Sequence, residues 1–229
     1  MNYNIIMNTM VVLFIIFILV SVFHVLTIVL KKEKLRRISK CLVIPLLAAV
    51  YISGGGSRFF FLLPALILGW VGDVLLLKIE KKAHFILGLA SFLIGHIFYM
   101  ITFIQILGLF GLNGGAPRIN IPSLLIFTAP AVVLSMVVFR LIKPTKEMFL
   151  PVVVYMTVLI VMNLLGFQVF LFNPGIAGLL ILSGCFNFIV SDSILAYYTF
   201  RKLKLLGAVL IMVYYILAQA EIVFGLMLL

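Results

Sequence analysis

Charged residues are scarce in this sequence. Asp, Glu, Lys and Arg together make up only 10% of it, against about a quarter in soluble globular domains. A chain of 229 residues is long enough to form a soluble core, but so little polar surface could not cover one. The 66% share of hydrophobic residues and the mean hydropathy of +1.37 instead indicate an integral membrane protein.

Cysteine and histidine are also rare. Cys41 and Cys185 lie at or within apolar segments, where packing is their expected role, so we predict no disulfide framework. A zinc hydrolase needs several histidines that converge with an acid. His24, His84 and His96 show no short ligand spacing, and we therefore predict neither a metal nor another cofactor.

Acidic residues are outnumbered by basic ones, six to seventeen, which gives a net charge of +11. Such a charge would suit nucleic-acid binding, but its distribution excludes that class. Only Arg58 and Arg118 lie outside four clusters on alternate loops, the pattern of cytoplasmic loops in membrane proteins. We expect both termini outside the cytoplasm. The clusters are Lys31, Lys32, Lys34, Arg36, Arg37 and Lys40; Lys78, Lys81 and Lys82; Arg140, Lys143 and Lys146; Arg201, Lys202 and Lys204.

Long apolar segments recur through the whole chain. Most reach the length of about 20 residues that spans a bilayer as a helix. The second is short and must borrow residues from Leu35 onward, whereas the first lacks the features of a cleaved signal peptide. We predict an all-α, polytopic transmembrane bundle of eight helices in one domain, 1–229, with Gly-rich outer turns at 53–57 and 108–117. The segments are 11–30, 41–52, 59–77, 85–107, 121–141, 149–165, 175–200 and 205–228.

Three acidic residues lie inside apolar segments: Asp73, Asp192 and Glu221. A charged side chain at membrane depth costs about 3 kcal/mol on insertion scales, so such residues are functional hypotheses by default. Gly69 and Gly72 flank Asp73 and would let a neighbouring helix approach it. Glu221 falls in the outer half of its segment, where we expect a protonated, hydrogen-bonded acid.

Five polar side chains are predicted to share one layer of the membrane. Counted at the helical rise from their cytoplasmic ends, they lie about 8–18 Å deep. The alternative is a structural one, in which the acids pair with each other, with Lys40 or with His96. His24 and His84 lie near helix ends, where an interfacial position is expected. The five are Asp73, His96, Tyr155, Asp192 and Tyr215.

Several segments, in this order and spacing, resemble the lysoplasmalogenase (YhhN-like) family of integral membrane proteins. The resemblance covers nearly the whole chain from Lys40 onward. One departure is visible, because the family's Lys-Pro pair at the start of the second helix is Lys40-Cys41 here. The chain keeps Asp192 and Gln219, which favours an active enzyme. The segments are Gly72-Asp73-Val74-Leu75-Leu76, Phe85 to Tyr99 with its Gly95-His96 pair, Val190-Ser191-Asp192-Ser193 and Tyr214-Tyr215-Ile216-Leu217-Ala218-Gln219.

This resemblance implies an enzyme that hydrolyses the vinyl ether bond of lysoplasmalogens to a fatty aldehyde and glycerophospho-ethanolamine or -choline. Protonation of the vinyl carbon needs a positioned carboxylic acid, and a second carboxylate can stabilise the resulting cation and activate water. We predict Asp73 and Asp192 as this acid/base pair. His96, Tyr155, Tyr215 and Gln219 would orient or polarise the substrate, and Lys40 would meet its phosphate at the cytoplasmic mouth.

The expected partners are a lysophospholipid substrate and membrane lipids, in a multi-pass protein of a bacterial cell membrane with a site open to the cytoplasmic half. The alternative is a small proton-coupled carrier that uses the same acids as a relay. Against a carrier, the sequence has no inverted repeat and no matching pair of broken helices. Head-group preference and oligomeric state stay open.

Overall fold

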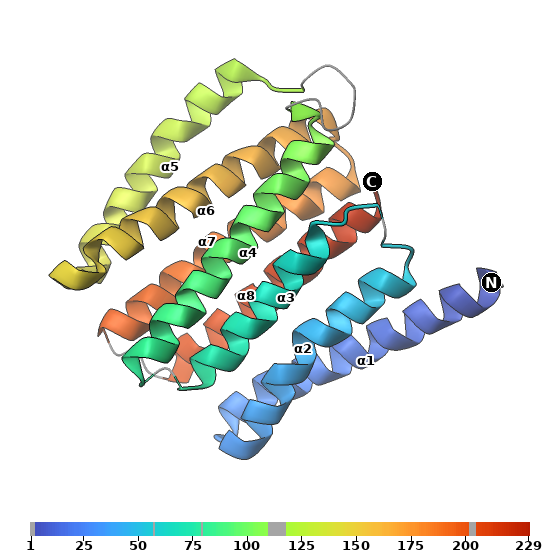
Figure 1. Cartoon of the computed structure of the whole chain (residues 1–229), viewed down its shortest axis with the longest axis horizontal. Coiled ribbons are helices and arrows are strands. Elements are labelled where there is room, and N and C mark those ends of the chain that lie inside the picture. The colour runs from blue at the N-terminus through green and yellow to red at the C-terminus, as the bar shows by residue number, and fades with distance from the viewer. Residues whose placement is uncertain (1–2, 57, 79, 110–117, 202–204) are drawn as a thin grey trace.

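The computed structural model describes residues 3–56, 58–78, 80–109, 118–201 and 205–229. Within these ranges the chain is all-helical without strands, which confirms the predicted all-α fold of eight helices (Figure 1). Parts of the two predicted outer turns (57 and 110–117) and the predicted loop residues Lys202 and Lys204 lie outside the described residues. The elements are α1 (Tyr3–Val29), α2 (Glu33–Ser53), α3 (Leu62–Leu75), the 3₁₀ turn η1 (Leu76–Lys78), α4 (Lys82–Ile106), α5 (Ile121–Ile142), α6 (Lys146–Phe172), α7 (Ile176–Arg201) and α8 (Leu205–Met227).

Six helices in the described ranges are long and apolar enough to cross a membrane, and α2 and α3 are the exceptions. Helix α3 has only 14 residues before it tightens into η1. Helix α2 begins at Glu33, well before the predicted apolar segment at Cys41, and its first turns are charged. Glu33 supports this early start, because its carboxylate accepts hydrogen bonds from Arg36 and Arg37 one turn ahead, at 2.7 and 2.9 Å.

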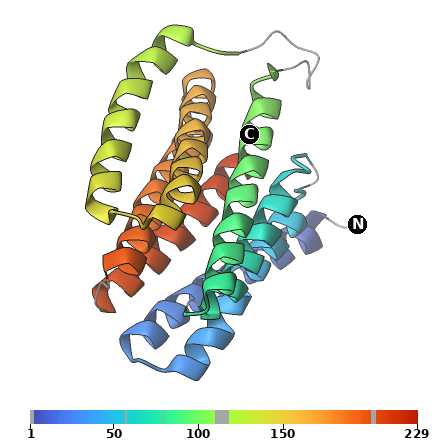
Figure 2. The same ribbon diagram turned by 60° about the vertical axis from the view of Figure 1, so that its left-hand side comes forward.

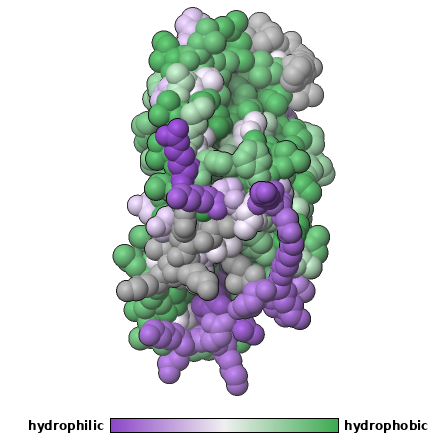
Figure 3. All heavy atoms as spheres, turned by 90° about the vertical axis from the view of Figure 1, so that its left-hand side faces the viewer, coloured by the Kyte–Doolittle hydropathy of each residue, from purple (hydrophilic) through white to green (hydrophobic). Residues whose placement is uncertain are grey.

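Both ends of the chain lie toward the same end of the bundle (Figure 1). A Cβ added at Gly54 would lie against Met227 of α8 and Met10 of α1, and Arg58 donates a 2.6 Å hydrogen bond to the Leu229 carbonyl. The charged loops after α1, α3 and α5 therefore gather at the opposite end. Figure 3, in which the left-hand side of Figure 1 faces the viewer, shows hydrophilic side chains projecting from the lower half of the molecule.

Glycine contacts hold the inner helices at short distances. A Cβ added at Gly184 of α7 would lie 2.9 Å from the Ala218 carbonyl oxygen of α8, and one at Gly225 would lie 2.8 Å from the Ala177 carbonyl oxygen. In α4, a Cβ added at Gly95 would lie 3.3 Å from the Ala65 carbonyl oxygen of α3. Small residues let membrane helices pack backbone to backbone, which brings polar side chains of neighbouring helices within hydrogen-bonding reach.

Helix α5 lies at the edge of the bundle (Figures 1 and 2). It packs on α6 through two aromatic pairs: the tilted rings of Phe127 and Phe167 have centroids 4.1 Å apart, and Phe139 and Phe149 meet edge to face at 5.2 Å. Its contacts with α6 and α7 are sparse in comparison with those between α7 and α8. The space that this loose packing leaves is the large cavity of the protein.

Candidate active site

Asp192 and Tyr155 form a hydrogen-bonded pair between α7 and α6. The Tyr155 hydroxyl donates to Oδ2 of Asp192 at 2.8 Å. Nε2 of His96, from α4, lies 3.8 Å from the same oxygen, within ion-pair range but beyond hydrogen-bonding distance. The His96 and Tyr155 rings meet edge to face with centroids 5.7 Å apart. Three helices thus aim a carboxyl group, a phenol and an imidazole at one point.

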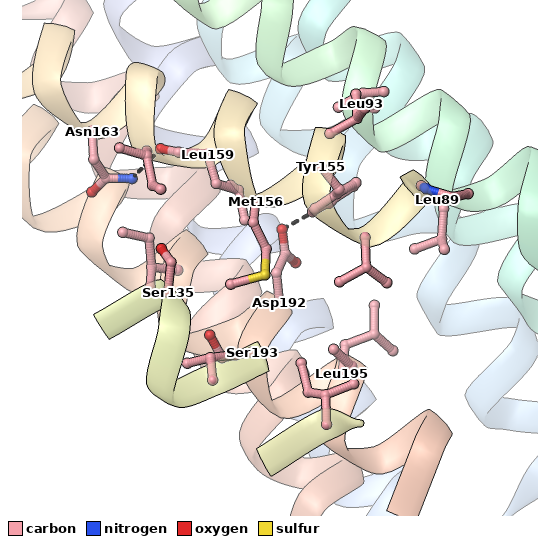
Figure 4. A pocket seen from close by; sticks show the side chains of 18 of the residues that line it. Leu89, Leu93, Ser135, Tyr155, Met156, Leu159, Asn163, Asp192, Ser193 and Leu195 are labelled. Atoms are coloured by element: carbon pink, nitrogen blue, oxygen red, sulfur yellow. Dashed lines mark hydrogen bonds between the residues drawn. The ribbon is translucent and has the colours of Figure 1, made fainter. Parts of the chain in front are cut away.

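A cavity of about 1150 Å³ opens beside this pair, between α4, α5, α6 and α7. Figure 4 shows Tyr155 and Asp192 pointing toward each other, with side chains of all four helices around them. The volume slightly exceeds the range of about 300–1,000 Å³ for small-molecule sites. Most of the wall is aliphatic or aromatic, and its acidic residues are Asp192 and, at the charged end of the bundle, Glu147. The apolar lining includes Leu89, Leu93, Met156, Leu159, Phe167 and Leu195.

Asp73 belongs to a second network, between α2, α3 and α8. Its Oδ1 lies 3.3 Å from the Lys40 ammonium nitrogen, and its Oδ2 accepts a 2.9 Å hydrogen bond from the Tyr215 hydroxyl. Asp73 and Lys40 are buried, with 2% and 8% of their surface exposed. A buried ion pair is strongly destabilised when one partner is removed. The network therefore ties α2, α3 and α8 together.

Two glycines make room for this network, as predicted. A Cβ added at Gly69 would lie 3.0 Å from the Gln219 amide nitrogen and 3.2 Å from the Tyr215 hydroxyl. One added at Gly72 would lie 2.7 Å from the Phe92 ring of α4. The Gln219 side chain is buried here and accepts a hydrogen bond from the Tyr99 hydroxyl. Gln219 thus links α8 to α4 and does not line the large cavity.

The ring of Phe188, on α7, lies between the two networks. It meets His96 edge to face at a centroid distance of 4.9 Å and Tyr215 at 6.1 Å. The structure thus brings the five residues predicted to share a layer into one continuous cluster. It does not place the two predicted catalytic acids together, because Asp192 faces the cavity and Asp73 lies beyond Phe188. No pattern in the sequence distinguishes Phe188 from the other apolar residues of its helix.

Lys40 differs from its predicted role. We expected its ammonium group to meet a phosphate at the cytoplasmic mouth, but it is buried against Asp73 and does not line the cavity. This is the structural alternative considered from the sequence. The cause is the early start of α2, which places Lys40 in the second turn of a helix and turns it toward α3.

Other buried polar residues serve packing. His24 was expected at the interface but is fully buried, with Nδ1 2.9 Å from the Ser39 hydroxyl, because α2 covers this face of α1. Glu221 accepts a 2.8 Å hydrogen bond from the Asn187 amide, as expected for a bonded acid in the outer half. Within the described ranges, no three His, Cys, Asp or Glu side chains lie close enough to hold one metal ion.

The helices and the buried acids define a multi-pass α-helical membrane protein with a lipid-sized cavity. A sequence model of the YhhN family matches residues 35–226, and the chain belongs to this family. Searches of curated proteins and of solved structures gave no match. The match begins in α2 and ends in α8, so it includes both polar networks and every wall of the cavity.

Proposed function

We propose that this protein is a membrane-embedded hydrolase that cleaves the vinyl ether bond of lysoplasmalogens, releasing a fatty aldehyde and glycerophospho-ethanolamine or -choline. The observation that carries the proposal is the Asp192–Tyr155 pair on the wall of a long apolar cavity. Family membership supports it, because the segments that resemble lysoplasmalogenases all lie within the matched residues 35–226. The reaction needs a carboxylic acid beside an apolar chain, and this cavity supplies both.

The length of the cavity fits a single lipid chain. Tyr155 and Phe167 both line it and are twelve positions apart on α6, which corresponds to about 18 Å of helix. A chain of sixteen carbons extends about as far, at roughly 1.2 Å per bond along its axis. A lipid whose vinyl ether lies at Asp192 can therefore extend its alkenyl chain along α6 to Phe167.

In the proposed reaction the Asp192 carboxyl group donates its proton to the β-carbon of the vinyl ether. The electron pair of the double bond forms the new C–H bond, and an oxocarbenium ion remains at the ether carbon. The Asp192 carboxylate stabilises this cation and then accepts a proton from the water that attacks it. The hemiacetal collapses to aldehyde and alcohol, one water is consumed, and Asp192 is protonated again.

The neighbours of Asp192 suit this double role. Tyr155 and His96 both approach Oδ2, which leaves Oδ1 to carry the transferred proton. The apolar wall favours the neutral acid in the resting state. The Tyr155 hydrogen bond then stabilises the carboxylate that forms after proton transfer.

Asp73 takes a positioning role in this proposal. Its ion pair with Lys40 and its hydrogen bond from Tyr215 fix the Tyr215 ring, which packs on Phe188 and through it on His96. The acid/base pair predicted from the sequence is thereby divided, with Asp192 at the substrate and Asp73 behind it. Whether Asp73 also contributes charge stabilisation is decided by a double variant described in the Discussion.

The test uses purified protein in detergent with 1-alkenyl-glycerophosphoethanolamine and its saturated 1-alkyl ether as the matched control. Aldehyde should form from the vinyl ether alone, because an alkyl ether has no double bond to protonate. Absence of aldehyde from folded protein would reject the hydrolase. The alternative function, a proton-coupled carrier, would then be tested by uptake into sealed proteoliposomes, since only a carrier needs a closed compartment.

A further inference from the structure

One ion pair joins two helices where the cavity reaches the charged end of the bundle. The Lys82 ammonium nitrogen lies 2.5 Å from Oε2 of Glu147. Lys82 is the first residue of α4 and Glu147 the second of α6. Both side chains are exposed, at 70% and 73%, and both line the cavity that holds Asp192. From the sequence we placed Lys82 in a cluster of basic loop residues and gave it no specific role.

An exposed ion pair of this kind adds at most about 1 kcal/mol to stability, so its position calls for another explanation. Lys82 and Glu147 place one positive and one negative charge at the mouth of a cavity whose other walls are mainly apolar. Lys82 and Glu147 lie in the first turns of α4 and α6, and the start of a helix favours a phosphate group. The complementary ligand is a zwitterion on an apolar chain.

We propose that Lys82 and Glu147 form the head-group subsite of this cavity, in which Lys82 binds the phosphate and Glu147 binds the ammonium group of a zwitterionic lysophospholipid. The two side chains exchange their contact with each other for contacts with the two charges of the lipid. This inference rests on the proposed function and adds to it the class of head group.

The spacing along α6 supports this assignment. Glu147 and Tyr155 are eight positions apart, or about 12 Å along the helix. In a 1-alkenyl-glycerophosphoethanolamine the ammonium nitrogen and the β-carbon of the vinyl ether are separated by eleven bonds, about 13 Å when extended. An ammonium group that contacts Glu147 at the mouth can therefore place the vinyl ether at the depth of Tyr155 and its partner Asp192.

The chemistry of the subsite predicts which head group binds best. A primary ammonium group donates hydrogen bonds to the Glu147 carboxylate, and charge-assisted hydrogen bonds are stronger than contacts without them. A trimethylammonium group has no N–H to donate. The subsite should therefore prefer ethanolamine to choline, and either of them to a lipid with phosphate alone.

The test is a binding competition that does not depend on turnover. Purified full-length protein in detergent is offered an equimolar mixture of 1-hexadecyl-glycerophosphoethanolamine, 1-hexadecylglycerophosphate and 1-hexadecylglycerol. Native mass spectrometry then gives the ratio of the bound species. The saturated ethers cannot be hydrolysed, and because they share one chain, the contribution of the cavity wall is the same for all three lipids.

The variants are Lys82→Gln and Glu147→Gln. Their matched controls are Lys81→Gln and Glu80→Gln, exposed neighbours that do not line the cavity.

Glu147→Gln should lower the preference for the ethanolamine lipid over the phosphate lipid about fivefold, the size expected for an exposed charge pair. Lys82→Gln should lower the preference for the phosphate lipid over the glycerol lipid by a similar factor, and the controls should match wild type. Ratios unchanged in both cavity variants would overturn the subsite and leave only a structural ion pair. Failure of the proposed function would show separately, as absence of aldehyde from vinyl ethers in wild type.

Discussion

The Tyr155 hydroxyl and Oδ2 of Asp192 lie 2.8 Å apart, and both residues line the cavity. The contact crosses from α6 to α7, so two membrane helices fix the geometry of the acid. In a mainly apolar cavity, such a preorganised donor acts on charge that develops in the transition state at little cost of reorganisation.

Asp192→Asn should lower aldehyde release from 1-alkenyl-glycerophosphoethanolamine by about a thousandfold or more, within the range that a general acid contributes. An amide keeps the shape of the side chain but cannot donate the required proton. The rate is measured in detergent on protein that elutes as a single folded species. Activity within about tenfold of wild type would exclude Asp192 as the acid.

Tyr155→Phe should lower kcat about tenfold and leave KM nearly unchanged, because it removes one hydrogen bond to a group that becomes charged. The ring and its packing on His96 stay in place. Tyr197→Phe is the matched control, since Tyr197 is a half-exposed residue of α7 that does not line the cavity. A rise in KM at constant kcat would instead assign Tyr155 to substrate binding.

Asp73→Asn should lower the free energy of unfolding by about 3 kcal/mol or more, because Lys40 is left buried without its counter-ion. The double variant Lys40→Met with Asp73→Asn should regain most of this stability, since an uncharged pair leaves no buried charge without a counter-ion. Both effects can be read from thermal unfolding in detergent.

The activity of that double variant decides the role of Asp73. For a positioning residue we expect aldehyde release within about tenfold of wild type once the fold is restored. A stable double variant that is as inactive as Asp192→Asn would make Asp73 a second catalytic carboxylate, as the sequence alone had suggested.

Ala90→Phe should raise KM for a hexadecenyl substrate about tenfold, because the added ring occupies space on the α4 wall of the cavity. An octenyl substrate, which fills less of the cavity, should be affected less. Ala83→Phe adds the same bulk at an exposed position of α4 outside the cavity and should change neither value. Equal effects on both chain lengths would place the alkenyl chain elsewhere.

The helices could be predicted closely from the sequence because membrane insertion depends on local composition. The predicted segment 121–141 and the observed α5, Ile121–Ile142, differ by one residue. The prediction was less accurate for α2, which continues into charged residues whose side chains pair along the helix. Hydropathy marks where a helix is apolar, whereas hydrogen bonds and side-chain pairs decide where it ends.

The sequence by itself determined the class of the protein, its eight helices and the position of each polar residue along its helix, because composition and a helical rise of about 1.5 Å per residue fix these quantities along one axis. Only the tertiary structure decided which residues at that depth meet. Asp192 faces a cavity, Asp73 faces Lys40, and the Phe188 ring lies between them. Lateral contacts depend on the rotation and packing of each helix against its neighbours, and no single segment encodes these.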